Sequence, residues 1–327
     1  MRTALTELLG IEAPIVLAPM GGAVTPALAA AVSNAGGLGT MPLSHSTPDE
    51  IRSSVTEITA LTDRPFGVNL ILEWDQRDRL AAALDAGAPA ISLFWGDASD
   101  LAPAAHDAGA VVLVSVGSVD EAVRAATAGA DVVVAQGWEA GGHVRGTVTT
   151  LALVPRVVDA VDPVPVIAAG GIADGRGLAA VLALGAAGAW IGTRFLAAHE
   201  CSIHDEYRQR LLEAAEGDTY YTGLFDGGWP AAPHRVLRNS TVDVWEEAGR
   251  PGSGERPGEG DDIAARADGS PIKRYASATP QASMTGEMEA LPNWAGQGVG
   301  LVTRIQPAAE IVRELVAGAE RILAKSA

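Results

Sequence analysis

A single histidine follows an apolar segment that is expected to form a buried strand. Residues 132–135 read Val-Val-Val-Ala, and the chain continues through Gln136 and the glycine pair Gly141-Gly142 to His143. An imidazole titrates near neutral pH, so it can act as a general base or as a positioned cation. His143 is therefore the candidate catalytic residue; the alternative interpretation is a histidine on a surface loop.

Two glycine-containing corners follow later apolar segments. Gly170 and Gly171 end the seventh segment, and Gly192 and Thr193 follow the eighth. In β/α barrels, the loops after the seventh and eighth strands often bind phosphate through free backbone N–H groups. The two corners predict a phosphate site, and tight turns without a ligand are the alternative.

Other strand ends carry residues that suit a flat ligand. The sequence Pro19-Met20-Gly21-Gly22 allows close approach of a ring to the backbone, although it is equally compatible with a simple turn. Asn69, Gln136 and, more weakly, Ser115 are polar residues at the ends of apolar segments. A buried amide needs a hydrogen-bond partner, which either a ligand ring edge or a neighbouring backbone group can supply.

Other kinds of catalytic or metal site find little support. His199 and His204 flank Cys201 and Asp205, but their spacing matches no known structural zinc site, so no metal is expected. Cys201 has no adjacent base or cation cluster, which argues against a nucleophilic role. The chain contains neither a Gly-x-Ser-x-Gly elbow nor a Walker-type phosphate loop.

The elements that must position these residues repeat along the chain. Eight apolar segments recur at intervals of about 20–25 residues, the length of one βα unit. Continuous apolar strands are typical of parallel sheets that are covered on both faces. The sequence therefore predicts an α/β fold, a (β/α)₈ TIM barrel. The rival is a doubly wound sheet, whose glycine fingerprint is missing after the first strand. The expected strands are Ile15–Ala18, Leu38–Thr40, Phe66–Leu70, Ala90–Phe94, Val111–Ser115, Val132–Gln136, Val164–Ala169 and Gly188–Ile191.

The repeating pattern stops after the eighth strand and returns near the C-terminus. We expect residues 1–200 and 290–327 to form the barrel, with Ala308–Lys325 as its last helix. Residues 201–289 are expected to form a smaller insertion or lid on the catalytic face. Within it, residues 246–271 are rich in Gly, Pro and acidic residues, which predicts a flexible loop.

Composition excludes several classes of protein. The formal net charge is −17, which disfavours binding to nucleic acid or to anionic membranes. The single cysteine rules out an intrachain disulfide. There is no signal-peptide pattern and no apolar run of about 20 residues. These features predict a soluble cytoplasmic protein.

Taken together, the motifs resemble those of the nitronate monooxygenase family, formerly called 2-nitropropane dioxygenases. The resemblance covers about residues 14–200, and Ala295-Gly296-Gln297 with the final helix extends it. The motifs that carry it are Ala18-Pro19-Met20-Gly21-Gly22, the run 31–39, Gly67-Val68-Asn69, Glu139-Ala140-Gly141-Gly142-His143, the run 168–177 and Gly192-Thr193-Arg194-Phe195.

The resemblance implies an FMN-binding TIM barrel that oxidises alkyl nitronates with O₂ to a carbonyl compound and nitrite, with nitroalkanes as further candidate substrates. It implies that His143 is the catalytic histidine over the flavin. The phosphate-holding residues would be Gly170, Gly171, Gly192 and Thr193, and the ring-lining residues would be Pro19, Met20, Asn69 and Gln136. Gln297 would approach the flavin, and the expected cofactor-binding set also includes Gly21, Gly142 and Ala169.

One departure from the family pattern concerns an arginine. The family often reads Gly-Gly-His-Arg-Gly, whereas Val144 here separates His143 from Arg145. The resemblance therefore does not assign a role to Arg145.

Two other functions remain open at this stage. The same motifs resemble FMN-dependent reductases that use NAD(P)H and act on an enoyl thioester or a quinone. A flavin- or phosphate-binding protein without activity is the non-enzymatic alternative. The expected partners are a small nitronate substrate and O₂, and the oligomeric state is open, with a homodimer as the candidate.

Overall fold

Eight parallel strands form a barrel, which confirms the expected fold class. The computed structural model describes residues 1–326. Three strands have the expected bounds, and the ends of the other five differ from the expected ones by at most two residues. The barrel strands are β1 (Ile15–Leu17), β2 (Gly39–Pro42), β3 (Phe66–Ile71), β4 (Ala90–Phe94), β5 (Val111–Val116), β6 (Val132–Gln136), β8 (Val166–Ala169) and β9 (Gly188–Ile191).

The strand order is β1-β9-β8-β6-β5-β4-β3-β2, with every neighbouring pair parallel. Backbone hydrogen bonds around Leu38 join the two ends of this order. The N–H of Leu17 donates to the carbonyl of Leu38 at 2.9 Å, and the N–H of Leu38 donates to the carbonyl of Ile15 at 2.9 Å. The sheet therefore closes on itself, as a barrel requires.

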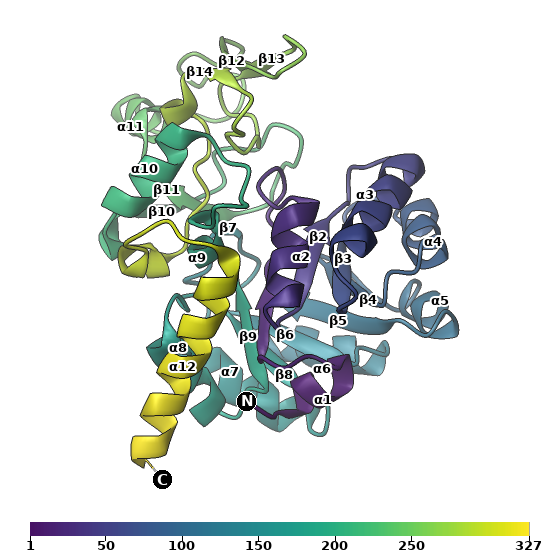
Figure 1. Ribbon diagram of the computed structural model, residues 1–327. Helices are drawn as coiled ribbons and strands as arrows, with labels where there is room; N and C mark the ends of the chain where they lie inside the picture. The colour runs from purple at the N-terminus through teal and green to yellow at the C-terminus, as the bar shows by residue number, and fades with distance from the viewer. Residues whose placement is uncertain (327) are drawn as a thin grey trace.

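Helices follow the strands in alternation and form the outer layer (Figure 1). The last of them, α12, packs against α8 and α2. Thr25 caps α2 by accepting a hydrogen bond from the N–H of Leu28, with Pro26 in the first helical position. The barrel helices are α1 (Ala4–Leu9), α2 (Pro26–Asn34), α3 (Pro48–Leu61), α4 (Arg77–Asp85), α5 (Ala102–Asp107), α6 (Val119–Thr127), α7 (Thr150–Val161), α8 (Gly175–Ala183), α9 (Thr193–Leu196) and α12 (Ala308–Ser326).

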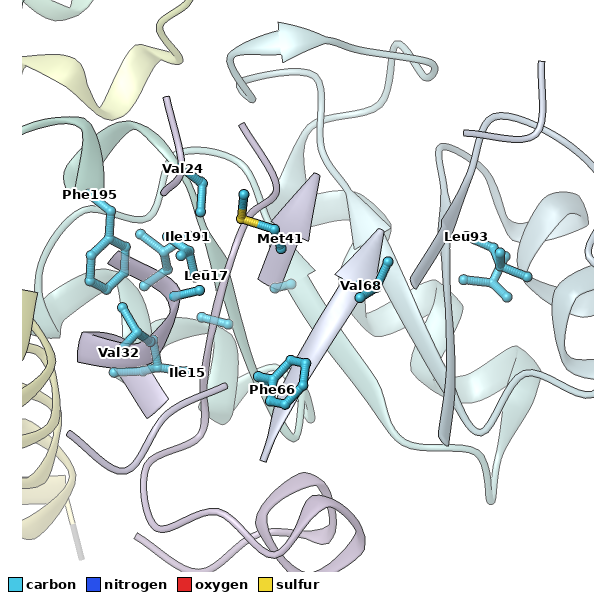
Figure 2. Packing of buried hydrophobic residues seen from close by; sticks show 14 of the residues in the cluster. Ile15, Leu17, Val24, Val32, Met41, Phe66, Val68, Leu93, Ile191 and Phe195 are labelled. Carbon is cyan, nitrogen blue, oxygen red and sulfur yellow. The ribbon is translucent and has the colours of Figure 1, made fainter. Parts of the chain in front are cut away.

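Alternate residues of most barrel strands fill two separate cores. Val16 and Trp190 point into the barrel, where Leu5 and Leu9 of α1 pack against the same cluster. Their strand neighbours belong to the larger core between strands and helices, part of which Figure 2 shows with Ile15, Leu17, Ile191 and Val32. Because successive strand residues face opposite sides, a continuous apolar strand can serve both cores.

The chain between α9 and α12 lies over one end of the barrel (Figure 1). Its first sheet joins β10 (Thr219–Thr222) and β11 (His234–Leu237) to β7 (Gly142–His143), a short strand from the barrel loop after β6. Its second sheet consists of β12 (Asp262–Ala265), β13 (Pro271–Lys273) and β14 (Thr285–Gly286). The helices here are α10 (Asp205–Glu213), η1 (Glu216–Asp218), α11 (Ser240–Glu247), η2 (Met288–Ala290) and η3 (Gln297–Leu301).

The segment 246–271 contains β12 and is held by a buried arginine. Arg256 forms ion pairs with Asp226, at 2.8 Å, and with Glu259, and its guanidinium lies over the Tyr275 ring. The expected flexibility of this segment stays a prediction. Among the described residues, no helix is both long and apolar enough to cross a membrane.

Candidate active site

His143 lies in β7, where the insertion meets the barrel. It is paired with His234 of β11 in the antiparallel ladder. Gln136, at the end of β6, contacts the same loop: its Nε2 donates to the carbonyl of His143 at 3.0 Å, and its Oε1 accepts from the N–H of Arg145 at 3.3 Å. A barrel strand and an insertion strand therefore fix the backbone on both sides of the histidine.

Aromatic rings surround the imidazole of His143. The indole of Trp229 lies 4.1 Å away between ring centroids at an interplanar angle of 33°, and that of Trp294 lies 5.4 Å away at 36°. His234 and Trp95 contact the imidazole more steeply, at 5.5 and 6.2 Å. The Nε2 atom is buried and has no hydrogen-bond partner among the described residues. This atom is the free polar group of the site.

Burial keeps His143 neutral. Desolvation, with a smaller contribution from His234, lowers the pKa of His143 to about 3. Desolvation also lowers the pKa of His234 to about 4. His234 Nδ1 lies 2.9 Å from the carbonyl of Ala232, and its Nε2 accepts from the N–H of Phe225 at 3.2 Å, which suits a neutral ring protonated at Nδ1. The positively charged form of His143 considered from the sequence is therefore disfavoured at neutral pH.

The two glycine corners lie on neighbouring strands. Ala169 at the end of β8 is in register with Trp190 of β9, so Gly170-Gly171 and Gly192-Thr193 leave the barrel side by side. Gly170 and Gly171 have φ values of 104° and 71°, which favour glycine. Neither Gly171 nor Thr193 donates its backbone N–H to another described residue. The corners thus offer adjacent free donors, as the predicted phosphate site requires.

The segment 295–298 covers these corners. The N–H of Gly296 donates to the Thr193 hydroxyl at 3.1 Å, and the N–H of Gln297 donates to the carbonyl of Glu139 at 2.9 Å. A Cβ on Gly141 would lie 2.4 Å from the nitrogen of Gly296, so only glycine permits this approach. The structure therefore brings Gln297 to the loop that leads to His143.

The first strand end is covered by the insertion. The Thr279 hydroxyl donates to the carbonyl of Gly21 at 2.6 Å, and Trp294 Nε1 donates to the same hydroxyl at 3.0 Å. Met20 lies near the second corner, since a Cβ on Gly192 would be 3.4 Å from the Met20 sulfur. The loop 19–22 is thereby connected to both the corners and the residues around His143.

The two strand-end amides have protein partners. Asn69 Nδ2 donates to the hydroxyl of Ser92 at 3.1 Å and lies 3.3 Å from its carbonyl. Gln136 is engaged by the His143 loop, as described above. The structure thus supplies protein partners for both amides, and their contact with a ligand ring stays a proposal.

The residues considered for a metal site have other roles. The Nδ1 of His204 accepts from the N–H of Glu206 as the cap of α10. Cys201 is buried, and desolvation raises the pKa of its thiol to about 12. Within residues 1–326, no three or more His, Cys, Asp or Glu side chains form a group that could hold a metal.

The sequence analysis missed the aromatic residues of the site and His234. Trp95 follows β4, Trp229 lies in the loop before β11, and Trp294 precedes η3. The seven tryptophans of the sequence were the signal that could have indicated an aromatic site. Their convergence depends on how the insertion folds over the barrel, which no local motif encodes.

The chain is similar to several known proteins. A model of the nitronate monooxygenase family matches residues 2–79 and 72–318. A nitronate monooxygenase of Pseudomonas aeruginosa is 35% identical, with 97% of this chain and 99% of the relative covered. A dehydrogenase of Mycobacterium tuberculosis that is named for a hydroindene carboxyl-CoA is 42% identical, over 76% of this chain and 70% of the relative.

Two solved structures superpose on nearly the whole chain. FabK from Thermotoga maritima superposes with a TM-score of 0.86 at 35% identity, covering 99% of this chain and 98% of that one. A nitroalkane oxidase from Streptomyces ansochromogenes superposes with a TM-score of 0.80 at 30% identity, covering 99% of this chain and all of the other.

Proposed function

The chain belongs to the nitronate monooxygenase family, and from this premise we propose that it oxidises alkyl nitronates with O₂ to a carbonyl compound and nitrite, with FMN as its cofactor. The observation that carries the proposal is the buried, unpartnered Nε2 of His143 at the end of the barrel that holds the two glycine corners. Catalytic groups of TIM barrels lie at the C-terminal ends of the strands.

The residues present fit FMN. Gly171 and Thr193 offer free N–H groups on adjacent corners, suited to the phosphate. A Cβ on Gly21 or Gly142 would meet no atom within 4 Å, so the space beside the backbone is open there. We assign the phosphate to Gly170, Gly171, Gly192 and Thr193. The ring would be lined by Pro19, Met20, Gly21, Asn69, Gln136, Gly142, Ala169 and Gln297.

Bound FMN would supply the redox chemistry, and the protein would supply orientation and a dry environment. A neutral His143 can donate or accept one hydrogen bond at Nε2, according to its tautomer. Towards a nitronate, an Nε2–H donor would hold a nitro oxygen. A histidine with a pKa near 3 is a weak base, so removal of a proton from a neutral nitroalkane is disfavoured. The preferred substrate is therefore the preformed nitronate.

The insertion has a separate role in this proposal. We assign residues 1–200 and 290–327 to the cofactor-binding barrel and residues 201–289 to a cover over the reacting atoms. The Thr279–Gly21 hydrogen bond and the β7–β11 pairing support this division, because they join the cover to two barrel loops. Exclusion of water would strengthen the polar interactions within the site.

Oxygen uptake and nitrite release test the activity. Purified protein loaded with FMN is given a preformed alkyl nitronate and, separately, the parent nitroalkane at the same concentration. We expect oxygen uptake and nitrite with the nitronate and a much lower rate with the nitroalkane. A yellow protein that is inert to nitronates would overturn the proposal.

A second candidate is an NAD(P)H-driven FMN reductase acting on an enoyl thioester or a quinone. It is favoured by the 42% identical relative, whose name is that of a carboxyl-CoA dehydrogenase, and by the similarity to FabK. Anaerobic mixing with NADH or NADPH separates the two functions. Rapid bleaching of the flavin supports the reductase, and an unchanged flavin spectrum supports the monooxygenase.

A further inference from the structure

A polar cavity of about 210 Å³ lies at the ends of β4 and β5. Its lining comes from the loop 96–98, the end of β5 with Ser115, and the side chains of Glu121, Arg124 and Arg145. A water molecule in the liquid occupies about 30 Å³, so the cavity has room for a group of several non-hydrogen atoms. Arg145 is the residue whose role the sequence left open.

The acidic side chains of this cavity already have partners. Glu121 accepts from Arg145 Nε at 2.5 Å and from the N–H of Gly117 at 2.7 Å. Asp97 accepts from the N–H of Ser99 at 2.9 Å.

The arginine side chains of the cavity, in contrast, have unused hydrogen-bond donors. The guanidinium of Arg124, an exposed residue, has no hydrogen-bond or ion-pair partner among the residues that the structure describes, and the guanidinium of Arg145 uses only one of its five N–H donors. Both arginines therefore keep donors that suit an anion, while Asp97 and Glu121 supply opposing charge in the same lining.

One indole ring contacts both Arg145 of this cavity and His143. The guanidinium of Arg145 lies 5.3 Å from the centroid of the Trp95 ring. The same ring contacts Trp229 at 5.1 Å and His143 at 6.2 Å. Trp95 has a φ of 66°, a strained conformation for a bulky residue and one that is found mostly at functional sites. Trp95 therefore connects Arg145 to His143 through direct contacts.

The charges of the protein give this cavity a role. A nitronate is an anion, and a net charge of −17 repels anions at long range. His143 is neutral and supplies no compensating charge. Arg124 and Arg145 are the cationic side chains that line the cavity next to it.

We propose that the cavity binds an oxyanion, a carboxylate or a phosphate, carried by the substrate away from its reacting carbon, with Arg124 and Arg145 as donors. The assignment of this ligand to the substrate rests on the proposed function of the His143 site. The presence of an oxyanion site is independent of that function, because it depends on the arginines alone.

Calorimetric titration tests binding without turnover. The probes are glutarate, for a carboxylate, and coenzyme A, for a phosphate, each added to the FMN-loaded protein at low ionic strength. The variants are Arg124→Gln and the control Arg156→Gln, which removes the same charge from an exposed position on α7. A hydrogen bond to a charged group contributes about 1.5–3 kcal/mol, which corresponds to a factor of about 10–100 in affinity.

We expect at least one probe to bind, with its affinity lowered at least about 10-fold by Arg124→Gln and not by Arg156→Gln. A carboxylate source and a phosphate source are distinguished by which probe binds. Binding of neither probe, or equal affinity in wild type and Arg124→Gln, overturns the proposal.

Kinetics connect the site to the substrate. The ratio of kcat/KM for propionate 3-nitronate to that for butane 1-nitronate compares a carboxylate tail with an uncharged tail. We expect Arg124→Gln to lower this ratio about 10-fold or more and Arg156→Gln to leave it unchanged. An unchanged ratio in Arg124→Gln removes the substrate role. A protein inert to both nitronates that still binds glutarate through Arg124 would lose the proposed function and keep the oxyanion site.

Discussion

The side-chain amide of Gln136 bonds the backbone on both sides of the His143 loop, to the carbonyl of His143 at 3.0 Å and from the N–H of Arg145 at 3.3 Å. The two bonds use the donor and the acceptor ends of one amide. Gln136 is thereby a positioning residue: it holds the loop that carries both the imidazole and the cavity arginine.

Replacement of Gln136 tests this role. In Gln136→Glu the carboxylate still accepts from the N–H of Arg145 but cannot donate to the carbonyl of His143. A neutral hydrogen bond contributes about 0.5–1.5 kcal/mol, so we expect a loss of about 2- to 10-fold in kcat with a smaller change in KM. Steady-state kinetics with a nitronate measure both. An increase in KM at constant kcat would instead indicate that Gln136 binds substrate directly.

Removal of the imidazole should affect turnover more than flavin content. In His143→Gln the backbone pairing with β11 is retained, but the neutral donor at Nε2 is lost. We expect kcat for a nitronate to fall about 10- to 100-fold, the effect of losing a hydrogen bond to a charged group, with FMN retained after gel filtration. Loss of the flavin in this variant would show that His143 mainly supports the cofactor, and near-wild-type rates would exclude it from the reaction.

The two buried histidines should make the protein sensitive to acid. Their folded pKa values, about 3 and about 4, lie below the ordinary value of 6.5, so they contribute stability above pH 6.5 that is lost as the pH falls towards 4. One proton per histidine corresponds to a slope of up to about 1.4 kcal/mol per pH unit. Urea unfolding between pH 7.5 and 4.5 should give a smaller slope in His143→Gln than in wild type. Equal slopes would mean that His143 is protonated in the folded protein.

Glycine at position 141 should be required for closure of the site. A Cβ there would lie 2.4 Å from the nitrogen of Gly296, so Gly141→Ala displaces the segment 295–298. We expect a loss of about 1–3 kcal/mol in the free energy of unfolding and reduced FMN content. Gly223→Ala is the matched control, since its Cβ would meet no atom within 4 Å. Similar melting temperatures and flavin content in the two variants would contradict the packing argument.

The thiol of Cys201 should be unreactive in the folded protein. It is buried, its Sγ lies 3.4 Å from the carbonyl of Ala23, and its pKa is raised to about 12. Because the thiolate is the reactive form, we expect no reaction with a disulfide reagent at pH 8 until a denaturant is added. Absorbance of the released thiolate measures this. Rapid labelling of the native protein would show that the segment around Cys201 opens.

The sequence by itself determined the barrel and the residues at its strand ends. Continuous apolar strands such as 132–136 must be buried on both faces. Separated by helices, such strands leave few alternatives to a parallel barrel. The position of His143 just after such a strand, and of Gly171 and Thr193 after the next two, followed from the same local pattern.

Only the tertiary structure decided the state and the surroundings of those residues. The neutral state of His143 and its contacts with Trp229 and Trp294 arise between segments far apart in the chain, and the ion pair of Arg145 with Glu121 joins two barrel segments. A pKa depends on desolvation and on nearby charges, which are properties of the packed site and not of the local sequence. Motifs could therefore indicate which residues meet at the site, while packing set their charge and access.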